Sequence, residues 1–292
     1  MISYNLGGHS GCQIFLIEDD EGKVFVRKIS KDKDYNDRLK KQYEKQASFL
    51  NDNIRTPKVY SEGYTEDGLY FFDMEYIQGI TLAKYIKTME IGKIKGLVES
   101  LTGSLIPKTQ EQVTPQQQNK VVEIFNTKFT ELRNALSSKN NDIINEALNL
   151  LDTHDWSKIT PSLCHGDMTL ENIIVKNDKL YFIDFLDSFC DSWILDIGTL
   201  LQDIQVMWSY RFEKNVNMNT VLRLIVFRDL LIDEIKKIDS SYVIEVYYAL
   251  LQKLIRIYPY VNDESTYAFL NEKVKLVLQN IFELEKPAGE GI

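Results

Sequence analysis

The chain has 292 residues, 44% of them hydrophobic, which is enough apolar material for one two-lobed unit or two small domains with a buried core. Its 43 acidic residues outnumber its 34 basic ones and give a net charge of -9, which disfavours a nonspecific nucleic-acid binder because phosphate neutralisation needs a basic surface. Cys12, Cys164 and Cys190 have neither a disulfide pattern nor metal-ligand spacing, and no secretion signal or membrane-spanning stretch is recognisable, so we expect a cytoplasmic protein without membrane insertion.

The first 80 residues are typical of a small β-sheet with one helix. Val, Ile, Tyr and Phe are enriched in four segments that we predict to be strands, namely 13–17, 23–29, 58–64 and 69–76. Residues 34–50 contain many Lys, Gln and Leu and few helix breakers, so this segment is predicted to be the helix. A glycine-rich turn at 6–12 is expected to lie between two strands, so a further strand precedes it. The expected order is then three strands, a helix and two strands.

The rest of the chain is expected to be helical apart from one hairpin. Residues 81–155 have a helical pattern that the polar stretch 108–120 interrupts. Two short strands are predicted near 172–175 and 180–184, joined by the turn Lys176–Lys179. After Trp193 we predict helices over 194–212, 218–237, 240–257 and 263–284.

A β-rich front, a helical back and a turn-rich insert between them predict an α+β fold with two lobes around a cleft. We place the boundary after residue 79. The N-terminal lobe, 1–79, is expected to be an antiparallel sheet with one helix, and the larger lobe, 80–292, is expected to be mostly helical.

The insert contains three polar side chains suited to phosphate chemistry. Asp167 precedes Asn172 by five residues, and Asp184 stands at the end of the next predicted strand. A carboxylate such as Asp167 can orient and deprotonate an acceptor hydroxyl. Asn172 and Asp184 offer hard oxygen ligands of the kind that Mg²⁺ prefers together with phosphates. The set predicts a phosphoryl-transfer site with Asp167 as catalytic residue and Asn172 and Asp184 as metal ligands.

The segment HGDMTLEN followed by YFIDF resembles the catalytic signature of aminoglycoside phosphotransferases and choline kinases, which are relatives of the protein kinases. The resemblance implies a bilobal protein-kinase-like fold with a nucleotide-binding N-terminal lobe and a catalytic, substrate-binding C-terminal lobe. It also implies Mg²⁺-assisted in-line transfer of the γ-phosphoryl group of ATP, or of GTP, to a small alcohol such as choline, ethanolamine, an aminoglycoside or a sugar-like compound. His165 is usually structural in this motif and braces the loop.

Upstream residues fit the nucleotide side of such a site. Gly8, Ser10 and Gly11 belong to the glycine-rich turn, where backbone N–H groups can approach phosphates without a Cβ in the way. The alternation in VFVRK turns Lys28 toward the apolar face of its strand, and Lys28 resembles the family's phosphate-pairing lysine. The resemblance further implies that this lysine pairs with a helix glutamate, and we assign Glu44 to that position.

The resemblance also covers the connection between the lobes and the region after the catalytic segment. FDMEYIQG resembles the interlobe hinge, where the backbone C=O of Glu75 and N–H of Ile77 would contact adenine. Asp196 resembles the family's helix-start aspartate that braces the catalytic loop. Only twelve residues separate Asp184 from Asp196, and no Ala-Pro-Glu anchor of a protein-kinase activation segment follows, so a small-molecule acceptor is expected. The alternatives are a protein Ser/Thr kinase-like enzyme and a nucleotide-binding pseudokinase that acts through partner contacts.

The acceptor side is predicted on the helix that starts near Asp196. At about 100° per residue, Asp203 lies about 20° from Asp196 around this helix, and Arg211 lies within about 60° of that stripe. Trp208 is close by in sequence on another face, where it could pack in the core or form a rigid wall of the pocket. Asp203 would favour a cationic acceptor and Arg211 one with a carboxylate or phosphate, while both could instead be structural ion-pair residues. The sequence leaves this choice and the oligomeric state open.

Overall fold

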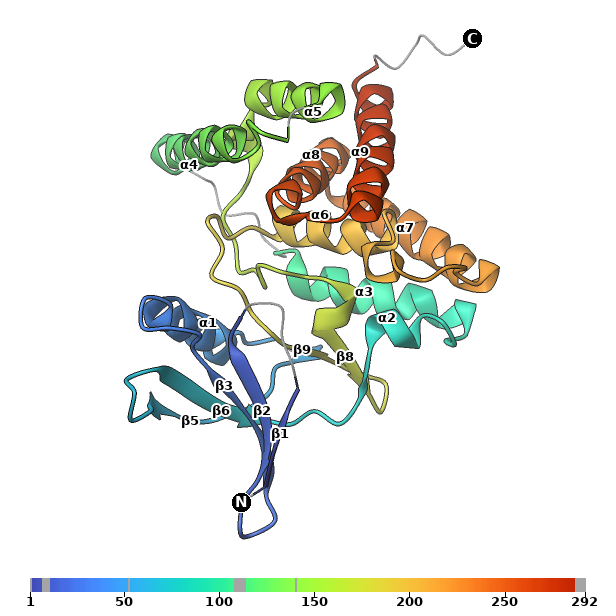
Figure 1. The fold of residues 1–292 in the computed structure, drawn as a ribbon. Helices are drawn as coiled ribbons and strands as arrows, with labels where there is room; N and C mark the ends of the chain where they lie inside the picture. The colour runs from blue at the N-terminus through green and yellow to red at the C-terminus, as the bar shows by residue number, and fades with distance from the viewer. Residues whose placement is uncertain (1, 7–10, 52, 108–113, 140, 287–292) are drawn as a thin grey trace. The chain divides into compact units, whose positions relative to one another are not determined.

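The computed structural model describes residues 2–6, 11–51, 53–107, 114–139 and 141–286 (Figure 1). The chain has an α+β fold with an antiparallel sheet in its N-terminal part and a larger helical part, as predicted. It divides into two compact units. The first comprises Met1–Tyr85, His165–Asp167 and Glu171–Ser188, and the second comprises Ile86–Cys164, Met168–Leu170 and Phe189–Ile292.

The main sheet of the first unit has five strands in the order β1-β2-β3-β6-β5, and neighbouring strands are antiparallel. Its strands are β1 (Ile2–Asn5), β2 (Gln13–Glu18), β3 (Val24–Ile29), β5 (Val59–Tyr64) and β6 (Tyr70–Glu75). The last four lie at the segments predicted from the sequence.

Helix α1 (Asn36–Ser48) covers one face of this sheet. Tyr70, Phe72 and Met74 stand two residues apart on β6 and therefore point to the same face. They are buried in one cluster with Leu39 of α1, which is fully buried. Apolar burial on this face thus fixes which side of α1 faces the sheet.

A second sheet of the first unit has the order β4-β9-β8-β7. Its strands are β4 (Ile54–Arg55), β7 (Ile80–Thr81), β8 (Ile173–Lys176) and β9 (Lys179–Phe182), and the short helix α2 (Leu82–Tyr85) follows β7. Asn177 and Asp178 join β8 to β9 with φ values of 51° and 56°, the left-handed conformation that a tight two-residue hairpin turn needs. The predicted hairpin is confirmed.

The observed division differs from the predicted boundary after residue 79. The hairpin β8–β9 belongs to the first unit because β9 pairs with β4 in parallel and β8 pairs with β7 antiparallel. Since β4 and β7 have only two residues each, their sequences carry no strand period from which these pairings could be predicted.

The second unit is helical. Its longer helices are α3 (Ile94–Leu105), α4 (Pro115–Ala135), α5 (Asp142–Thr153), α6 (Trp193–Ile204), α7 (Met218–Ile238), α8 (Ser241–Ile255) and α9 (Glu264–Glu285). Short 3₁₀ turns are η1 (Ile91–Lys93), η2 (Trp156–Lys158), η3 (Leu170–Asn172), η4 (Trp208–Tyr210) and η5 (Tyr258–Tyr260), with η3 divided between the units. In the described ranges, no helix is long and apolar enough to cross a lipid bilayer.

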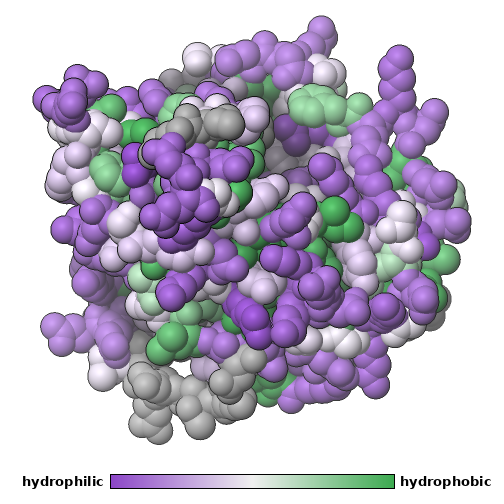
Figure 2. Space-filling view, turned by 90° about the horizontal axis from the view of Figure 1, so that it is seen from below, coloured by the Kyte–Doolittle hydropathy of each residue, from purple (hydrophilic) through white to green (hydrophobic). Residues whose placement is uncertain are grey.

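Helix α6 is the central helix of the second unit, and all of its residues are buried. Gly198 allows α8 to pack directly against it, because a Cβ at this position would lie 2.7 Å from the Cβ of Ala249. The face in Figure 2 contrasts with this interior, since it is mostly hydrophilic and its hydrophobic side chains are scattered in small groups.

The helix predicted over 194–212 is wrong at its C-terminal end, because α6 ends at Ile204. Met207 adopts a left-handed φ of 63°, which interrupts the helix. Asp203 accepts hydrogen bonds from the N–H of Ser209 at 2.9 Å and from its hydroxyl at 2.7 Å. A side chain that satisfies backbone groups in this way competes with helix continuation and favours the separate turn η4.

Candidate active site

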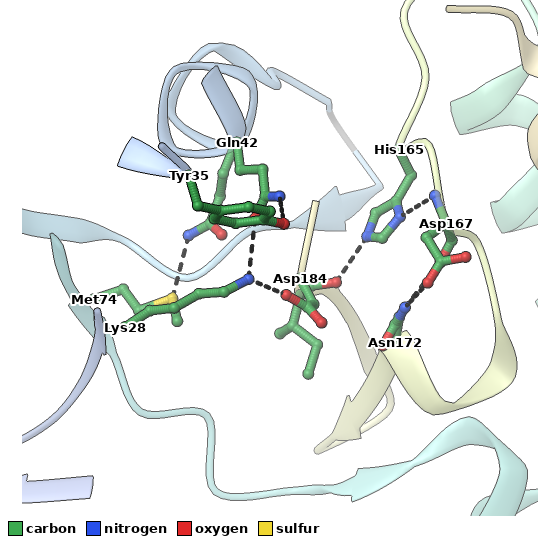
Figure 3. Close-up of polar contacts among 10 residues, drawn as sticks. Lys28, Tyr35, Gln42, Met74, His165, Asp167, Asn172 and Asp184 are labelled. Carbon is green, nitrogen blue, oxygen red and sulfur yellow. Dashed lines mark hydrogen bonds and ion pairs between the residues drawn. The ribbon is translucent and has the colours of Figure 1, made fainter. Parts of the chain in front are cut away.

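Lys28 is a buried lysine of the first unit. It lies on β3 opposite Phe72 of β6. Its side chain is only 3% exposed, and its Nζ donates a hydrogen bond to Gln42 Oε1 at 3.1 Å and forms an ion pair with Asp184 (Figure 3). Because an uncompensated buried charge is strongly destabilising, these two partners are what keep a charged ammonium inside the unit.

The helix partner of Lys28 is Gln42, so the prediction of Glu44 is wrong. Glu44 is exposed on α1, whereas Gln42 is buried. Gln42 Nε2 donates to the hydroxyl of Tyr35 at 3.1 Å, which turns its Oε1 toward Lys28. Residues two apart lie on different faces of a helix, and therefore only one of the two could face the lysine. The carboxylate that Lys28 contacts is that of Asp184.

His165 is fully buried and neutral at physiological pH. Its Nε2 donates to the carbonyl of Ile183 at 2.7 Å, and its Nδ1 accepts the N–H of Asp167 at 3.2 Å. Burial lowers the pKa of His165 to about 4, although the charges of Asp167 and Asp184 oppose this shift. A ring with both nitrogens engaged in hydrogen bonds braces the loop on each side, which is a structural role.

Asn172 holds the side chain of Asp167. Its Nδ2 donates to the backbone carbonyl of Asp167 at 2.8 Å and to Oδ2 of Asp167 at 3.2 Å, and Figure 3 shows the two side chains pointing toward each other. Asn172 Oδ1 accepts no hydrogen bond from the described residues. The N–H of Ile183 donates to the Asn172 carbonyl at 3.0 Å, which places Asn172 beside the strand end that carries Asp184.

Asp184 follows β9 with a φ of 62°, a left-handed conformation that non-glycine residues rarely adopt and that is characteristic of functional sites. Its side chain is 43% exposed. With Asn172 Oδ1 it offers two hard oxygens, a donor set that fits Mg²⁺ when phosphate oxygens and water complete the coordination. Within the described part of the chain, no three His, Cys, Asp or Glu side chains gather in a metal-binding cluster.

Gly166, between His165 and Asp167, is tightly packed. Its φ is 91°, and a Cβ there would lie 2.6 Å from the carbonyl oxygen of Leu186 and 2.7 Å from the hydroxyl of Ser188. The position therefore combines a conformation suited to glycine with contacts too short for any side chain.

We expect Gly166→Ala to lower the free energy of unfolding by about 2 kcal/mol or more, because it adds a steric clash to backbone strain. Gly22→Ala is the matched control. Gly22 has a similar φ of 79°, but nothing lies within 4 Å of an added Cβ. Urea unfolding of both variants measures the difference, and equal destabilisation would show that packing against Leu186 is unimportant.

The predicted phosphate-binding turn is described only in part. Gly11 has a φ of 77°, a conformation that favours glycine. Gly8 and Ser10 lie outside the described residues. All three assignments to the nucleotide remain predictions.

The predicted adenine contacts involve backbone groups after β6. Glu75 ends this strand, and its N–H donates to the carbonyl of Lys58 at 2.8 Å. The Ile77 side chain is buried with Ile174 and Tyr181. The first unit thus contains both residues, and their contact with adenine remains a prediction.

Asp203 does not line an acceptor site, so this prediction is wrong. Its side chain is fully buried in the second unit. Oδ2 accepts the N–H of Leu170 at 2.7 Å, while Oδ1 accepts both hydrogen bonds from Ser209. The carboxylate thus ties the turn η4 to Leu170, which follows Asp167 by three residues in the sequence.

Trp208 and Arg211 lie in and after η4 and not on α6, so the helical angle predicted for Arg211 is wrong. The Arg211 guanidinium lies over the rings of Trp208 and Phe212, with its Cζ 4.0 and 4.2 Å from their centroids. Nη1 donates to the Trp208 carbonyl at 2.9 Å, whereas the buried Nε has no hydrogen-bond partner among the described residues. Burial lowers the pKa of Arg211, and the charges of Asp203 and Asp263 oppose this shift.

Sequence reasoning missed Gln42 and also Lys45, whose Nζ contacts the segment after Asp184. A usable signal was present. Leu39, Gln42 and Gln46 follow one another at spacings of three and four residues, the period of a buried helix stripe. Had Leu39 been used to fix the buried face, the stripe would have selected Gln42 over Glu44.

Comparison with known proteins gives one family and one fold. The sequence model of the phosphotransferase enzyme family matches residues 3–219. No curated protein matches the sequence. A solved structure of a thermostable mutant of aminoglycoside phosphotransferase APH(4)-Ia, with AMP-PNP and hygromycin B, has a TM-score of 0.63 and 14% identity over 99% of this chain and 94% of that chain.

Two other solved structures are similarly related. A protein described as a fructosamine-3-kinase from Haemophilus somnus has a TM-score of 0.59 and 16% identity over 98% of this chain and 92% of that chain. Amicoumacin kinase hAmiN, with AMP-PNP, Ca²⁺ and amicoumacin, has a TM-score of 0.57 and 13% identity over 95% of this chain and 88% of that chain. At these identities the likeness shows the fold, which confirms the predicted protein-kinase-like class.

Proposed function

The chain belongs to the phosphotransferase enzyme family, and from this premise we propose that it transfers the γ-phosphoryl group of ATP or GTP to a hydroxyl of a small alcohol. The observation that carries the proposal is the arrangement of the first unit. There Lys28 is paired with Asp184, and Asn172 holds Asp167. Phosphoryl transfer needs these elements, namely a cation for the phosphates, oxygen ligands for Mg²⁺ and a carboxylate for the hydroxyl.

Asp167 is the catalytic residue of the proposal. The Asn172 amide fixes the orientation of its carboxylate, which would align the acceptor hydroxyl and take its proton as the phosphoryl group is transferred in line. Lys28 would contact the nucleotide phosphates. Backbone N–H groups of Gly8, Ser10 and Gly11 would cradle them.

Mg²⁺ would be held by Asn172 Oδ1 and the Asp184 carboxylate. When bound, the ion supplies charge neutralisation on the transferring phosphates. The adenine ring would contact the backbone carbonyl of Glu75 and the N–H of Ile77.

On the acceptor side, we propose that Trp208 and Arg211 bind a group of the alcohol. Burial of Asp203 removes the acidic side chain that would favour a cationic acceptor. The Arg211 guanidinium is held in place by two rings and has no carboxylate within ion-pair distance in the described chain. Because a guanidinium with unused donors matches carboxylate and phosphate groups, the favoured acceptor is an alcohol with an anionic group.

Acceptor-stimulated release of the nucleoside diphosphate, ADP from ATP or GDP from GTP, tests the function. The purified protein is incubated with Mg²⁺ and ATP or GTP and a panel of choline, ethanolamine, an aminoglycoside, sugars and sugar acids or phosphates. Stimulation by at least one alcohol, with the phosphorylated product seen by mass spectrometry, is expected. Nucleotide binding without release of ADP or GDP would favour the pseudokinase alternative, and radioactive phosphate on lysate proteins would favour a protein kinase.

We expect Arg211→Met to raise the acceptor KM about tenfold or more, since losing a hydrogen bond to a charged group costs about 1.5–3 kcal/mol. The slow ATPase reaction with water should be unchanged because only acceptor binding is affected. Arg228→Met, which removes a half-buried arginine paired with its neighbour Asp229, is the control. An acceptor KM that stays at the wild-type value in Arg211→Met would contradict the assignment.

A further inference from the structure

We infer that Lys45 is a positioning residue of the phosphoryl-transfer site, through which α1 holds the backbone that follows Asp184. The inference rests on the proposed function. It adds to the site a second α1 side chain, one turn after Gln42.

Lys45 contacts the segment after Asp184 directly. Its Nζ donates to the carbonyl of Leu186 at 3.1 Å and to the hydroxyl of Ser188 at 3.0 Å. Both acceptors belong to a stretch without regular secondary structure. This stretch is therefore not held in place by the backbone hydrogen bonds of a strand or a helix. An ammonium that bridges a carbonyl and a hydroxyl two residues apart can define the path of such a loop.

The same ammonium lies against the catalytic loop. A Cβ built on Gly166 would be 3.3 Å from Lys45 Nζ. The N–H of Leu186 donates to the carbonyl of His165 at 3.1 Å, so the loop of His165 and the segment of Leu186 are joined next to this lysine. Lys45 therefore contacts the point where the Asp167 loop and the Asp184 segment meet.

Helical spacing connects Lys45 with the nucleotide lysine. Gln42 and Lys45 are three residues apart on α1 and thus neighbours on its surface. Gln42 orients Lys28, and Lys45 orients the backbone beyond Asp184. One turn of α1 therefore supports both members of the Lys28–Asp184 ion pair, Lys28 through Gln42 and the backbone after Asp184 through Lys45.

Asp184 needs such support because its backbone is strained. Aspartate adopts a left-handed φ more readily than most residues, but Asp184 does so outside a tight hairpin turn, where contacts with its surroundings have to hold a φ of 62°. The Lys45 bond to Leu186, two residues later, is one such constraint. Without it, Asp184 would spend less time in the orientation that the proposed metal ligand requires.

Lys45→Met keeps an unbranched side chain that is one heavy atom shorter, and it removes the charge and the hydrogen-bond donor. Lys41→Met is the matched control, because Lys41 lies on the same helix and is exposed, with only a 3.8 Å ion pair to Asp187 in the same segment. The probe is a fluorescent ADP analogue titrated at a series of Mg²⁺ concentrations, together with hydrogen exchange of residues 184–188.

For Lys45→Met we expect the Mg²⁺ concentration at half-maximal nucleotide binding to rise about tenfold, the lower end of the effect seen when residues that orient metal ligands are replaced. Exchange in 184–188 should become faster, while Lys41→Met should match the wild type in both measurements. Lys45→Arg should recover part of the Mg²⁺ dependence because it keeps a cationic donor.

Should Lys45→Met fold poorly, Ser188→Ala serves in its place, since it removes only one acceptor of the Lys45 ammonium and should shift the Mg²⁺ dependence in the same direction by a smaller factor. Equal Mg²⁺ dependence and equal exchange in wild type, Lys45→Met and Ser188→Ala would overturn the positioning role and leave the proposed function intact. A wild-type protein that binds no Mg²⁺-nucleotide would overturn both.

Discussion

Asp167→Asn is expected to lower kcat about a hundredfold or more, within the range that general acid–base catalysis usually contributes. The substitution keeps the size of the side chain and an oxygen that can accept the hydrogen bond from Asn172. What is lost is the negative charge that attracts and accepts the hydroxyl proton. A fall in turnover would therefore report on the chemistry and not on a rearranged loop.

Nucleotide affinity should change little in Asp167→Asn, because the contacts of the Asp167 side chain that we assign are with Asn172 and the acceptor, not with ATP. Calorimetry with Mg²⁺ and ADP measures this affinity. Asp178→Asn is the control, since Asp178 is an exposed aspartate in the hairpin turn, in a left-handed conformation that asparagine tolerates. Near-normal turnover in Asp167→Asn would remove Asp167 from the mechanism.

Asp184→Asn should damage nucleotide binding as well as turnover. A neutral amide is a poorer ligand for a hard dication than a carboxylate, so we expect the Kd for the Mg²⁺-nucleotide complex to rise about tenfold or more. The same change removes the charge that Lys28 faces. Because Lys28 is buried, its ammonium would then have only two neutral amide partners, that of Gln42 and that of the new asparagine. The folded state should therefore also lose stability.

The two effects of Asp184→Asn can be separated by measurement. Nucleotide titrations with and without Mg²⁺ report the metal-dependent part, and thermal unfolding of the nucleotide-free protein reports the loss of the ion pair. Asp187→Asn is the control, because its carboxylate faces the exposed Lys41 at 3.8 Å. Wild-type affinity of Asp184→Asn for the Mg²⁺-nucleotide complex would rule out Asp184 as the principal metal ligand.

The reaction class could be predicted because the residues that we assign to it are close together in the chain. Asp167, Asn172 and Asp184 lie within one turn-rich segment and a short hairpin, where the order of residues nearly dictates their arrangement. The direction of Lys28 likewise follows from alternation along a single strand. Local periodicity also gave most helices of the second unit, since each buries one face over several turns.

The predictions for the acceptor side were wrong because the helical pattern of residues 194–212 does not show where the helix ends. The end of α6 depended on Asp203 bonding to Ser209 and Leu170 in place of helix continuation. Helical geometry placed Asp203 and Arg211 on one face only as long as the helix continued. Once it ended at Ile204, Asp203 became a buried anchor and Arg211 became part of a turn.

The sequence alone therefore determined the family resemblance, the α+β class and the candidate catalytic segment, because these depend on residues a few positions apart. Tertiary structure alone decided that Gln42 and not Glu44 faces Lys28, that Lys45 holds the segment after Asp184, and that β8 and β9 join the N-terminal unit. The physical reason is that each of these outcomes depends on which face of a helix or strand is buried against residues far away in the chain. The free energy of that burial is gained only when the distant segments come into contact.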